Sequence, residues 1–464
     1  MNGYSYASPK RVKITVNPLG EVSGKIGDGV GGYGYSVASY NFDTSKGDLR
    51  DGKGFALIDR FLPYAVKRIY YYRRITTAGT VSDRILAWCE DGYIYSLKLA
   101  SGTPTKLVSL HFTKEPTAVN YNFNGEDVMI FSSVNGDMLI YDGMSVTTVP
   151  SAPKVESMCI HGERLFLIDS ANRNSLWFSD DFDPTNWNVS LSEAGFIDMS
   201  GEKGRLLKVI SFGGYLYVFR SYGITRVTAY GEQQSFSVSD LFVSSGKIRG
   251  ESITVCGNCV LFFASDGLYR FDGLSATRIS DAYKDFIDFS FGAVRGAYYD
   301  GRAYFVVKTL FEGLSENCIF CIDPKNYSEY YFLKGAQPTD VTIVNGVNDY
   351  ALLAASGDGK ILRLIDDGVT AGEVNTKIWA GKFGDFGVSA KRKLLSEISF
   401  YSDTAAQIEV SADGRKKVYG VKGKIARQVI KPNLIADRFS IKIICTEKGA
   451  RVVGLTLKFD YYDD

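Results

Sequence analysis

Histidine is almost missing from this sequence of 464 residues, which contains only His111 and His161. Because histidine is the usual acid–base group at neutral pH, its scarcity argues against enzymes that depend on an imidazole. His111 lies in a strand-like run and His161 precedes a glycine at a turn, so both positions predict structural roles. No Gly-x-Ser-x-Gly elbow is present either. We therefore predict that the chain is not an enzyme and has no catalytic residues.

Long apolar runs are absent as well, and a run of about 18 apolar residues would be needed for a transmembrane helix. The polar N-terminal residues include Lys10, Arg11 and Lys13 but lead into no apolar segment, which argues against a secretion signal. Only 11 prolines occur, and no Ser/Pro-rich tract predicts a disordered linker. We expect a folded chain that is made and kept soluble in the cytoplasm.

The sequence also has no excess of charge of one sign: it contains 53 Lys and Arg and 52 Asp and Glu, which gives a formal charge of +1. No strong overall field should therefore draw the chain toward nucleic acid or anionic lipid. Two short basic runs, Lys391–Lys393 and Arg415–Lys417, are typical of solvated faces. They are also candidates for contact with a nucleic-acid backbone or an acidic partner.

Cysteine is sparse and odd in number, with seven residues in strand-like runs, which argues against a secreted disulfide scaffold. Two pairs, Cys256 with Cys259 and Cys318 with Cys321, have the Cys-x-x-Cys spacing of four-thiolate zinc sites. The second pair lies in a predicted strand, where residues three apart face opposite sides of the sheet. We therefore predict four unrelated core or turn thiols, with no metal and no cofactor.

Aromatic residues and glycine are abundant: the chain has 30 Tyr, 29 Phe and 48 Gly. Tyr and Phe suit half-buried strands, and Gly allows the positive φ of tight hairpin turns. Pairs of apolar strand-like runs joined by short Gly- or Asp-containing turns recur along the chain. These predicted hairpins begin at Arg84, Asp127, Arg164, Tyr215, Cys259, Arg302 and Tyr350.

The spacing of these hairpins predicts the fold. Successive starts are 43, 37, 51, 44, 43 and 48 residues apart, as expected for the irregular four-stranded blades of a propeller. We predict an all-β chain: an N-terminal extended arm or first strands at 1–75, a β-propeller of about seven blades at 76–375, and a small C-terminal β-sandwich-like domain at 376–464. A pair of β-sandwiches is the alternative, although its turns commonly come every 8 to 12 residues without a longer repeat.

Two further motifs are weak. Ser179–Trp187 partly matches the Asp-box turn of sialidase propellers, but Asp183 stands where that turn needs glycine and Trp187 is displaced by one residue. The glycines at Gly201–Gly204 and Gly27–Gly34 lack the strand, Gly-Lys-Ser/Thr and helix context of a phosphate-binding loop. We interpret all three segments as turns.

One set of segments gives a more specific indication of a protein family than the motifs above. Asn174–Ser179, Asp183–Trp187, Phe196–Met199 and Leu207–Val227, followed by Val260–Gly273, resemble the propeller of short-tailed bacteriophage tail hubs, the tail nozzle and packaged-DNA stabilisation proteins. Tyr40–Arg50 and Phe459–Tyr462 resemble the opening and closing segments of that family. The resemblance covers roughly residues 36 to 464 and consists of turn and strand residues.

The resemblance implies a virion structural protein of the phage tail, assembled in the host cytoplasm. It implies a hexameric ring that extends the DNA channel, contacts portal or adaptor proteins and tail fibres, touches passing double-stranded DNA without reading it, and helps to retain it until ejection. This chain lacks an obvious long insertion for fibre attachment, so the docking partner is open. The alternatives are a glycan-binding or glycan-cleaving propeller and a monomeric protein-interaction propeller.

Overall fold

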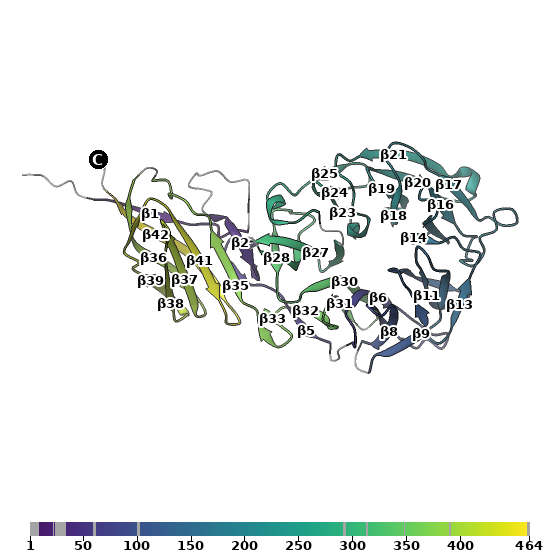
Figure 1. The fold of residues 1–464 in the computed structure, drawn as a ribbon, viewed down its shortest axis with the longest axis horizontal. Helices are drawn as coiled ribbons and strands as arrows, with labels where there is room; N and C mark the ends of the chain where they lie inside the picture. The colour runs from purple at the N-terminus through teal and green to yellow at the C-terminus, as the bar shows by residue number, and fades with distance from the viewer. Residues whose placement is uncertain are drawn as a thin grey trace, which may run out of the picture.

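The computed structural model describes residues 9–21, 23, 34–58, 62–99, 103–290, 294–311, 314–347, 349–388 and 391–461. Two β-modules lie side by side along the long axis of the molecule, a sandwich on the left and a propeller on the right in Figure 1. Within the described ranges, the helical elements η2 (Gln233–Ser235), η3 (Gly250–Ser252) and η4 (Lys284–Phe286) are short 3-10 turns. Within the described part of the chain, no helix has the length and hydropathy needed to cross a membrane.

Seven antiparallel sheets, each with a four-strand core, surround the central opening of the propeller. The first blade contains β6 (Val66–Tyr72), β7 (Arg84–Cys89), β8 (Tyr93–Lys98) and β9 (Thr105–His111). The second contains β10 (Thr117–Phe123), β11 (Glu126–Ser132), β12 (Met138–Tyr141) and β13 (Val146–Val149). The third contains β14 (Val155–His161), β15 (Arg164–Asp169), β16 (Ser175–Phe178) and β17 (Gly195–Asp198).

The chain continues around the ring in the same way. The fourth blade contains β18 (Leu206–Phe212), β19 (Tyr215–Arg220), β20 (Gly223–Thr228) and β21 (Ser237–Val243). The fifth contains β22 (Thr254–Cys256), β23 (Cys259–Ala264), β24 (Gly267–Phe271) and β25 (Ala276–Arg278). The sixth contains β26 (Arg295–Tyr299), β27 (Arg302–Phe311), β28 (Leu314–Ile322) and β29 (Tyr330–Leu333).

The seventh blade closes the ring with strands from two distant parts of the chain. It contains β30 (Pro338–Asn345), β31 (Tyr350–Ser356) and β32 (Ile361–Ile365), and its outer strand is β5 (Gly54–Leu57), antiparallel to β32. Two short strands, β33 (Val369–Thr370) and β34 (Glu373–Val374), extend the sheet beyond β5. Phe55 of β5 is 2% exposed and packs into the apolar cluster between the sixth and seventh blades. The N-terminal segment therefore fastens the last blade.

The seven-bladed propeller predicted from the hairpin spacing is confirmed. Each predicted hairpin forms the two middle strands of one blade, from β7 and β8 in the first to β31 and β32 in the seventh. Middle strands are covered on both faces, so they appear in the sequence as continuous apolar runs. In β11 the last five residues are buried, whereas β9 exposes five of its seven residues. The exposed outer strands give a much weaker pattern.

The second module is the predicted sandwich, and both ends of the chain build it. One sheet contains β1 (Lys10–Thr15), β3 (Phe42–Asp43), β4 (Leu49–Asp51), β36 (Lys393–Ser402), β39 (Lys424–Ile430), β40 (Leu434–Ala436) and β42 (Arg451–Tyr461). The other contains, in spatial order, β2 (Ser36–Tyr40), β35 (Lys377–Gly381), β41 (Phe439–Cys445), β37 (Ala406–Ala412) and β38 (Arg415–Val421). Residues 1–75 thus contribute strands to both modules, and residue 76 lies between β6 and β7 of one blade.

Asn41 joins the sandwich to the propeller. Its backbone N–H donates to the Phe332 carbonyl at 2.8 Å, and its side-chain oxygen accepts the Lys334 N–H at 2.7 Å. Its side-chain amide donates to the Thr376 carbonyl at 2.8 Å. The backbone φ of 61° is left-handed, a conformation that asparagine tolerates better than most residues. One residue therefore connects blade six, β2 and the segment before β35.

Replacing Asn41 by alanine should lower the free energy of unfolding by about 3 kcal/mol, because two side-chain hydrogen bonds are lost and alanine is strained at this φ. Asn124 is the matched control: its φ is 54° in a hairpin turn, without a comparable side-chain bridge. Asn124→Ala should cost only the backbone strain, about 1 kcal/mol. Denaturant unfolding measures both values, and equal losses in the two variants would contradict the bridging role.

Candidate functional site

Each of the seven blades places one charged side chain at the centre of the propeller. Four of these residues lie on innermost strands that have a β-bulge or a register irregularity near their first residue. A bulge changes the direction in which a nearby side chain points. The seven residues, here called the channel charge ring, are Arg68, Glu115, Glu156, Lys208, Glu251, Arg295 and Asp340. The ring joins blades that are adjacent and blades that face each other across the axis.

Arg68 is the centre of this network. Its guanidinium lies 3.3 Å from Glu115 Oε1, 3.3 Å from Glu251 Oε2 and 3.6 Å from Asp340 Oδ2. Arg295 donates to Glu115 Oε2 at 2.5 Å. Asp340, 2% exposed in its side chain, also accepts the backbone N–H of Ile69 at 2.8 Å and so fastens blade seven to blade one.

The electrostatic environment favours the charged forms of Glu251 and Arg68. Lys208, with Arg68 and Arg295, lowers the pKa of Glu251 to about 2 against the opposing effect of burial. Burial lowers the pKa of the Arg68 guanidinium, but Asp340, Glu251 and Glu115 together raise it above its ordinary value. Burial raises the pKa of Glu115, although both arginines act in the opposite direction. The ring is therefore a mutually neutralising cluster.

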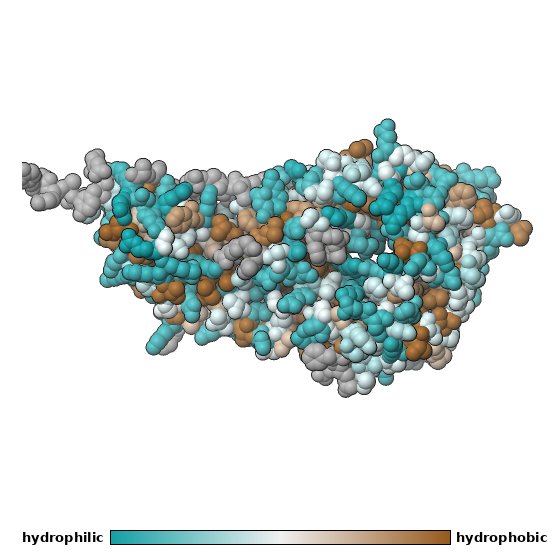
Figure 2. Space-filling view, in the orientation of Figure 1, coloured by the Kyte–Doolittle hydropathy of each residue, from teal (hydrophilic) through white to brown (hydrophobic). Residues whose placement is uncertain are grey.

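This cluster spans the axis of the propeller. Cavities of about 460 Å³ and about 250 Å³ adjoin it and share Arg68, Thr117 and Lys208 as lining residues. The ribbon in Figure 1 leaves a wide central opening, which side chains largely fill in Figure 2. Cavities of this size suit small molecules and cannot hold a nucleic-acid duplex.

The sequence contains a signal for the channel charge ring that the hairpin spacing does not reveal. The seven charged residues are 47, 41, 52, 43, 44 and 45 residues apart, which repeats the blade period. Their signs follow no regular order. Five of them stand on innermost strands, whereas Glu115 precedes β10 and Glu251 lies in η3. A search for charged residues at the blade period would have found them.

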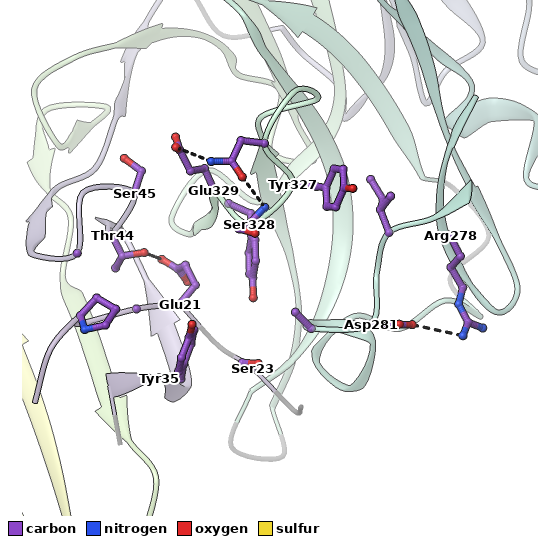
Figure 3. Close-up of a pocket in the computed structure, with 17 residues that line it drawn as sticks. Glu21, Ser23, Tyr35, Thr44, Ser45, Arg278, Asp281, Tyr327, Ser328 and Glu329 are labelled. Atoms are coloured by element: carbon purple, nitrogen blue, oxygen red, sulfur yellow. Dashed lines mark hydrogen bonds and ion pairs between the residues drawn. The ribbon is translucent and has the colours of Figure 1, made fainter. Parts of the chain in front are cut away.

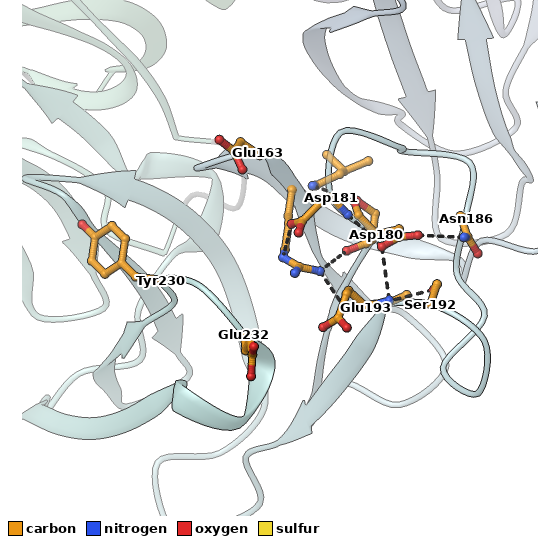
Figure 4. A network of polar contacts seen from close by, with 12 residues as sticks. Glu163, Asp180, Asp181, Asn186, Ser192, Glu193, Tyr230 and Glu232 are labelled. Carbon is orange, nitrogen blue, oxygen red and sulfur yellow. Dashed lines mark hydrogen bonds and ion pairs between the residues drawn. The ribbon is translucent and has the colours of Figure 1, made fainter.

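A second polar site lies on one rim of the third and fourth blades. A cavity of about 520 Å³ is lined by His161, Gly162, Glu163, Arg164, Asp181, Glu193, Ala229, Tyr230, Gly231 and Glu232. These residues come from β14–β15, the β16–β17 loop and the β20–β21 loop. Figure 4 labels the cavity carboxylates Glu163, Asp181, Glu193 and Glu232, together with Tyr230. We call this site the acidic cavity.

Only one carboxylate of the acidic cavity has a cationic partner among the described residues. Arg164 lies 2.8 Å from Asp181 Oδ1 and also donates to the carbonyl of Glu193 at 2.7 Å. Glu163, Glu193 and Glu232 are exposed and make no ion pair within the described part of the chain. Tyr230 presents a ring that is 54% exposed. The cavity therefore carries uncompensated negative charge beside an aromatic face.

His161, one of the two sequence candidates, is in the wall of this cavity. It is 5% exposed, its Nδ1 lies 2.9 Å from Ser211 Oγ, and the rings of Phe166 and Tyr230 pack against it. Its Nε2 is buried and has no hydrogen-bond partner among the described residues. His111, the other candidate, is exposed and packs on Tyr93 at 4.5 Å between ring centroids.

The pKa of His161 should make stability depend on pH. Burial lowers the pKa of this imidazole below its ordinary value of 6.5. As the pH falls below about 6.5, the unfolded chain binds the proton more readily than the folded chain, so the free energy of unfolding decreases. His161→Gln should remove this part of the decrease, whereas His111→Gln should leave it in place. Denaturant unfolding at about pH 7.5 and about pH 5.5 measures the difference, and identical pH dependence in both variants would contradict it.

A third cavity, of about 560 Å³, lies where the N-terminal segment passes blades five and six. Figure 3 shows Glu21, Tyr35 and Thr44 on one side and Arg278 and Asp281 on the other. Glu21 is 5% exposed, and its Oε1 accepts hydrogen bonds from Thr44 at 3.0 Å and Ser39 at 3.4 Å. These contacts fix the N-terminal segment against β2.

The fold separates the members of one Cys-x-x-Cys pair but not those of the other. Cys256 and Cys259 are opposite each other across a two-residue turn between β22 and β23. Cys318 packs between blades five and six and Cys321 packs between blades six and seven, because the two face opposite sides of β28. Burial raises the pKa of Cys318 to about 12 and of Cys321 to about 11. Within the described residues, no three His, Cys, Asp or Glu side chains are grouped to hold a metal ion.

The remaining sequence candidates have local roles. In the partial Asp-box, Asp183 accepts hydrogen bonds from Thr185, and the Trp187 indole donates to the Pro184 carbonyl at 2.9 Å. Lys393 of the first basic run is buried, and its ammonium donates to three backbone carbonyls. Gly201–Gly204 forms a turn, and most of Gly27–Gly34 lies outside the described residues. The second basic run is exposed on β38.

The two modules have opposite net charge, which the total of +1 conceals. Residues 54–375, which form the propeller, contain 29 Lys and Arg against 37 Asp and Glu. Residues 1–53 and 376–464, which form the sandwich, contain 24 Lys and Arg against 15 Asp and Glu. The propeller is therefore an acidic module and the sandwich a basic one.

Comparison with known proteins assigns no family. No family model matches the chain, and no curated protein matches it. It is similar to the crystal structure of BBS1N in complex with ARL6DN soaked with lead, with 10% identity and a TM-score of 0.44 over 67% of this chain and 93% of that chain. The same complex soaked with mercury gives 9% identity and a TM-score of 0.44 over 68% and 97%.

Proposed function

We propose that this chain is a structural subunit of a short-tailed phage tail, a hub or nozzle protein that assembles with copies of itself into a ring. The observation that supports this most is the segregation of charge, −8 on the propeller residues and +9 on the sandwich residues. Opposite charges on opposite ends of an elongated molecule favour head-to-tail contact between copies. Such heterologous contacts form a closed ring when their rotation closes.

The residues that resemble phage tail hubs are consistent with this role. Trp177 stacks on Phe196 with ring centroids 4.9 Å apart, and Phe219 is fully buried between blades four and five. They are framework residues, and they support a shared propeller without bearing on any chemistry. The rigid rims then supply the loops that contact portal or adaptor proteins and tail fibres.

The channel charge ring bears on where DNA would pass. Because ion pairs of the channel charge ring cross the axis of each propeller, we infer that packaged DNA in the assembled tail would pass along the common axis of the ring of copies. Its contacts would be made between cations and phosphates, without base recognition, and would weaken steeply with salt. The ring of copies thereby extends the DNA channel, retains the packaged DNA and conducts it during ejection.

The oligomeric state tests this proposal. Native mass spectrometry of the purified chain should give a ring of about six copies, alone or with its portal partner, and electron microscopy should show copies around an axial pore. A stable monomer in both conditions would contradict the ring and favour the monomeric interaction propeller. Hydrolysis of a glycan panel, lost on mutation of acidic residues, would favour the glycan-cleaving alternative.

A further inference from the structure

Strand β38 is an exposed edge of the basic module. It pairs only with β37 in its sheet, and its first four residues, Arg415 to Val418, are all exposed. Val418 is 57% exposed, and Tyr419 and Val421 pack against the sandwich core at the other end of the strand. An edge strand of seven residues with one open side is a natural contact surface.

Two cations on this edge are available to a partner. Lys416 pairs with Glu409 at 2.7 Å, whereas Arg415 and Lys417 make no ion pair among the described residues. They are two residues apart on a strand, so their side chains leave the same face of the sheet. Arg415 and Lys417 therefore form a paired basic tip.

The acidic cavity has the complementary chemistry. Glu163, Glu193 and Glu232 surround it without a cationic partner in the described chain, and Tyr230 offers an exposed ring for a cation. The buried His161, whose Nε2 has no hydrogen-bond partner among the described residues, forms part of the wall. In Figure 1 the blades that hold this cavity, with β16, β17, β20 and β21, are at the end of the molecule farthest from β38.

We infer that the basic tip of β38 in one copy enters the acidic cavity of the next copy. This inference rests on the proposed ring and names its interface: Arg415 and Lys417 face Glu163, Glu193 and Glu232. Because the two surfaces are at opposite ends of each copy, the contact is heterologous. Each copy therefore uses its basic tip with one neighbour and its acidic cavity with another.

Two alternative roles for the basic edge predict different results. Lysines on an edge strand discourage aggregation between sheet edges, and in that role they need no counterpart on the propeller. A basic edge could also contact the phosphates of DNA, and its loss would then change DNA retention without changing assembly. Charge reversal on each surface separates these roles from contact between copies.

The experiment uses two variants of the full chain. The tip variant carries Arg415→Glu and Lys417→Glu, and the cavity variant carries Glu163→Lys and Glu232→Lys. All four side chains are exposed and without ion pairs in the described chain, so both variants should retain the thermal midpoint of the wild type. Lys98→Glu with Lys247→Glu, and Glu126→Lys with Glu202→Lys, are controls with the same charge changes at other exposed positions.

Each variant alone should raise the concentration needed for assembly at least about tenfold, because like charges meet at every contact. Mixing the two variants should restore assembly. In the mixture, each unmodified tip meets an unmodified cavity, and each reversed tip meets a reversed cavity. Native mass spectrometry should then show rings in which the variants alternate, whereas the control variants assemble like the wild type.

The outcomes distinguish this inference from the proposed function. If the wild type does not assemble, the ring itself is wrong. If the wild type and both variants assemble equally well, the ring stands and this interface is wrong. If the tip variant assembles normally but releases double-stranded DNA at lower salt, β38 is a DNA-contact surface and the inference is overturned. Failure of the mixture to assemble also overturns it.

Discussion

Replacing Arg68 by methionine should lower the free energy of unfolding by about 3 kcal/mol at neutral pH, as expected when one partner of a largely buried ion pair is removed. The variant leaves Glu115, Glu251 and Asp340 without their shared cation, and Asp340 is 2% exposed in its side chain. We place the loss at the lower end of the range because Glu115 and Glu251 retain some contact with solvent. Denaturant unfolding measures this loss.

The control for Arg68 is an arginine in an ion pair on the surface. Arg11 lies 2.6 Å from Asp460, but its side chain is 69% exposed, so Arg11→Met should cost less than about 1 kcal/mol. A loss of similar size in both variants would show that the channel charge ring does not stabilise the propeller.

The pH dependence of the Arg68 variant provides a second test. In the wild type, Arg68 is among the cations that lower the pKa of Glu251 to about 2. A carboxyl with a lowered pKa stabilises the fold above its ordinary value of 4.5, and this stabilisation is lost as the pH falls toward 2. Arg68→Met should therefore show a smaller loss of stability than the wild type between these pH values. An unchanged slope would mean that Arg68 is not coupled to Glu251.

Substitution of Gly54 by alanine should prevent the seventh blade from closing and cost at least about 3 kcal/mol. A Cβ at this position would lie 2.0 Å from the Val369 carbonyl oxygen and 2.4 Å from its nitrogen. Because both atoms belong to the backbone of β33, no side-chain rotation relieves the clash. Limited proteolysis should cleave residues around β5 faster than in the wild type, and the thermal midpoint should fall.

Gly420 is the matched control for Gly54. It also lies in a strand, its φ is not left-handed, and a Cβ there meets nothing within 4 Å. Gly420→Ala should be neutral or slightly stabilising, because alanine reduces the conformational freedom of the unfolded chain. A Gly54→Ala variant as stable as Gly420→Ala would show that β5 does not fasten the ring tightly.

The propeller could be predicted from sequence because its middle strands are covered on both faces. Tyr215–Arg220 and Cys259–Ala264 are almost wholly buried and therefore appear as unbroken apolar runs beside a turn. The strand β5 could not be predicted in the same way, since it has four residues and its antiparallel partner β32 is about 300 residues away. The three-residue β4 was hidden for the same reason, because its partner β42 is about 400 residues away.

The sites were harder to predict than the fold. Glu163, Glu193 and Glu232 belong to three separate connections, and each alone looks like an ordinary solvated acid on a turn. Residues 376–464 alone contain 17 Lys and Arg against 10 Asp and Glu, so the basic character of the sandwich could be counted from the sequence. The pairing of the N-terminal strands with β42 and β35 adds residues 1–53 to this basic module. Topology, rather than local pattern, brings the three carboxylates together.

The pairing of both ends of the chain also determines the order of events during synthesis. Strand β1 pairs with β42, and β5 pairs with β32, so β1 and β5 leave the ribosome several hundred residues before their partners. The blades between them complete their hairpins locally and can form earlier. A translation product interrupted before β32 would therefore contain blades without a closed ring, and only polypeptides extended through β42 would present both modules to a neighbouring copy.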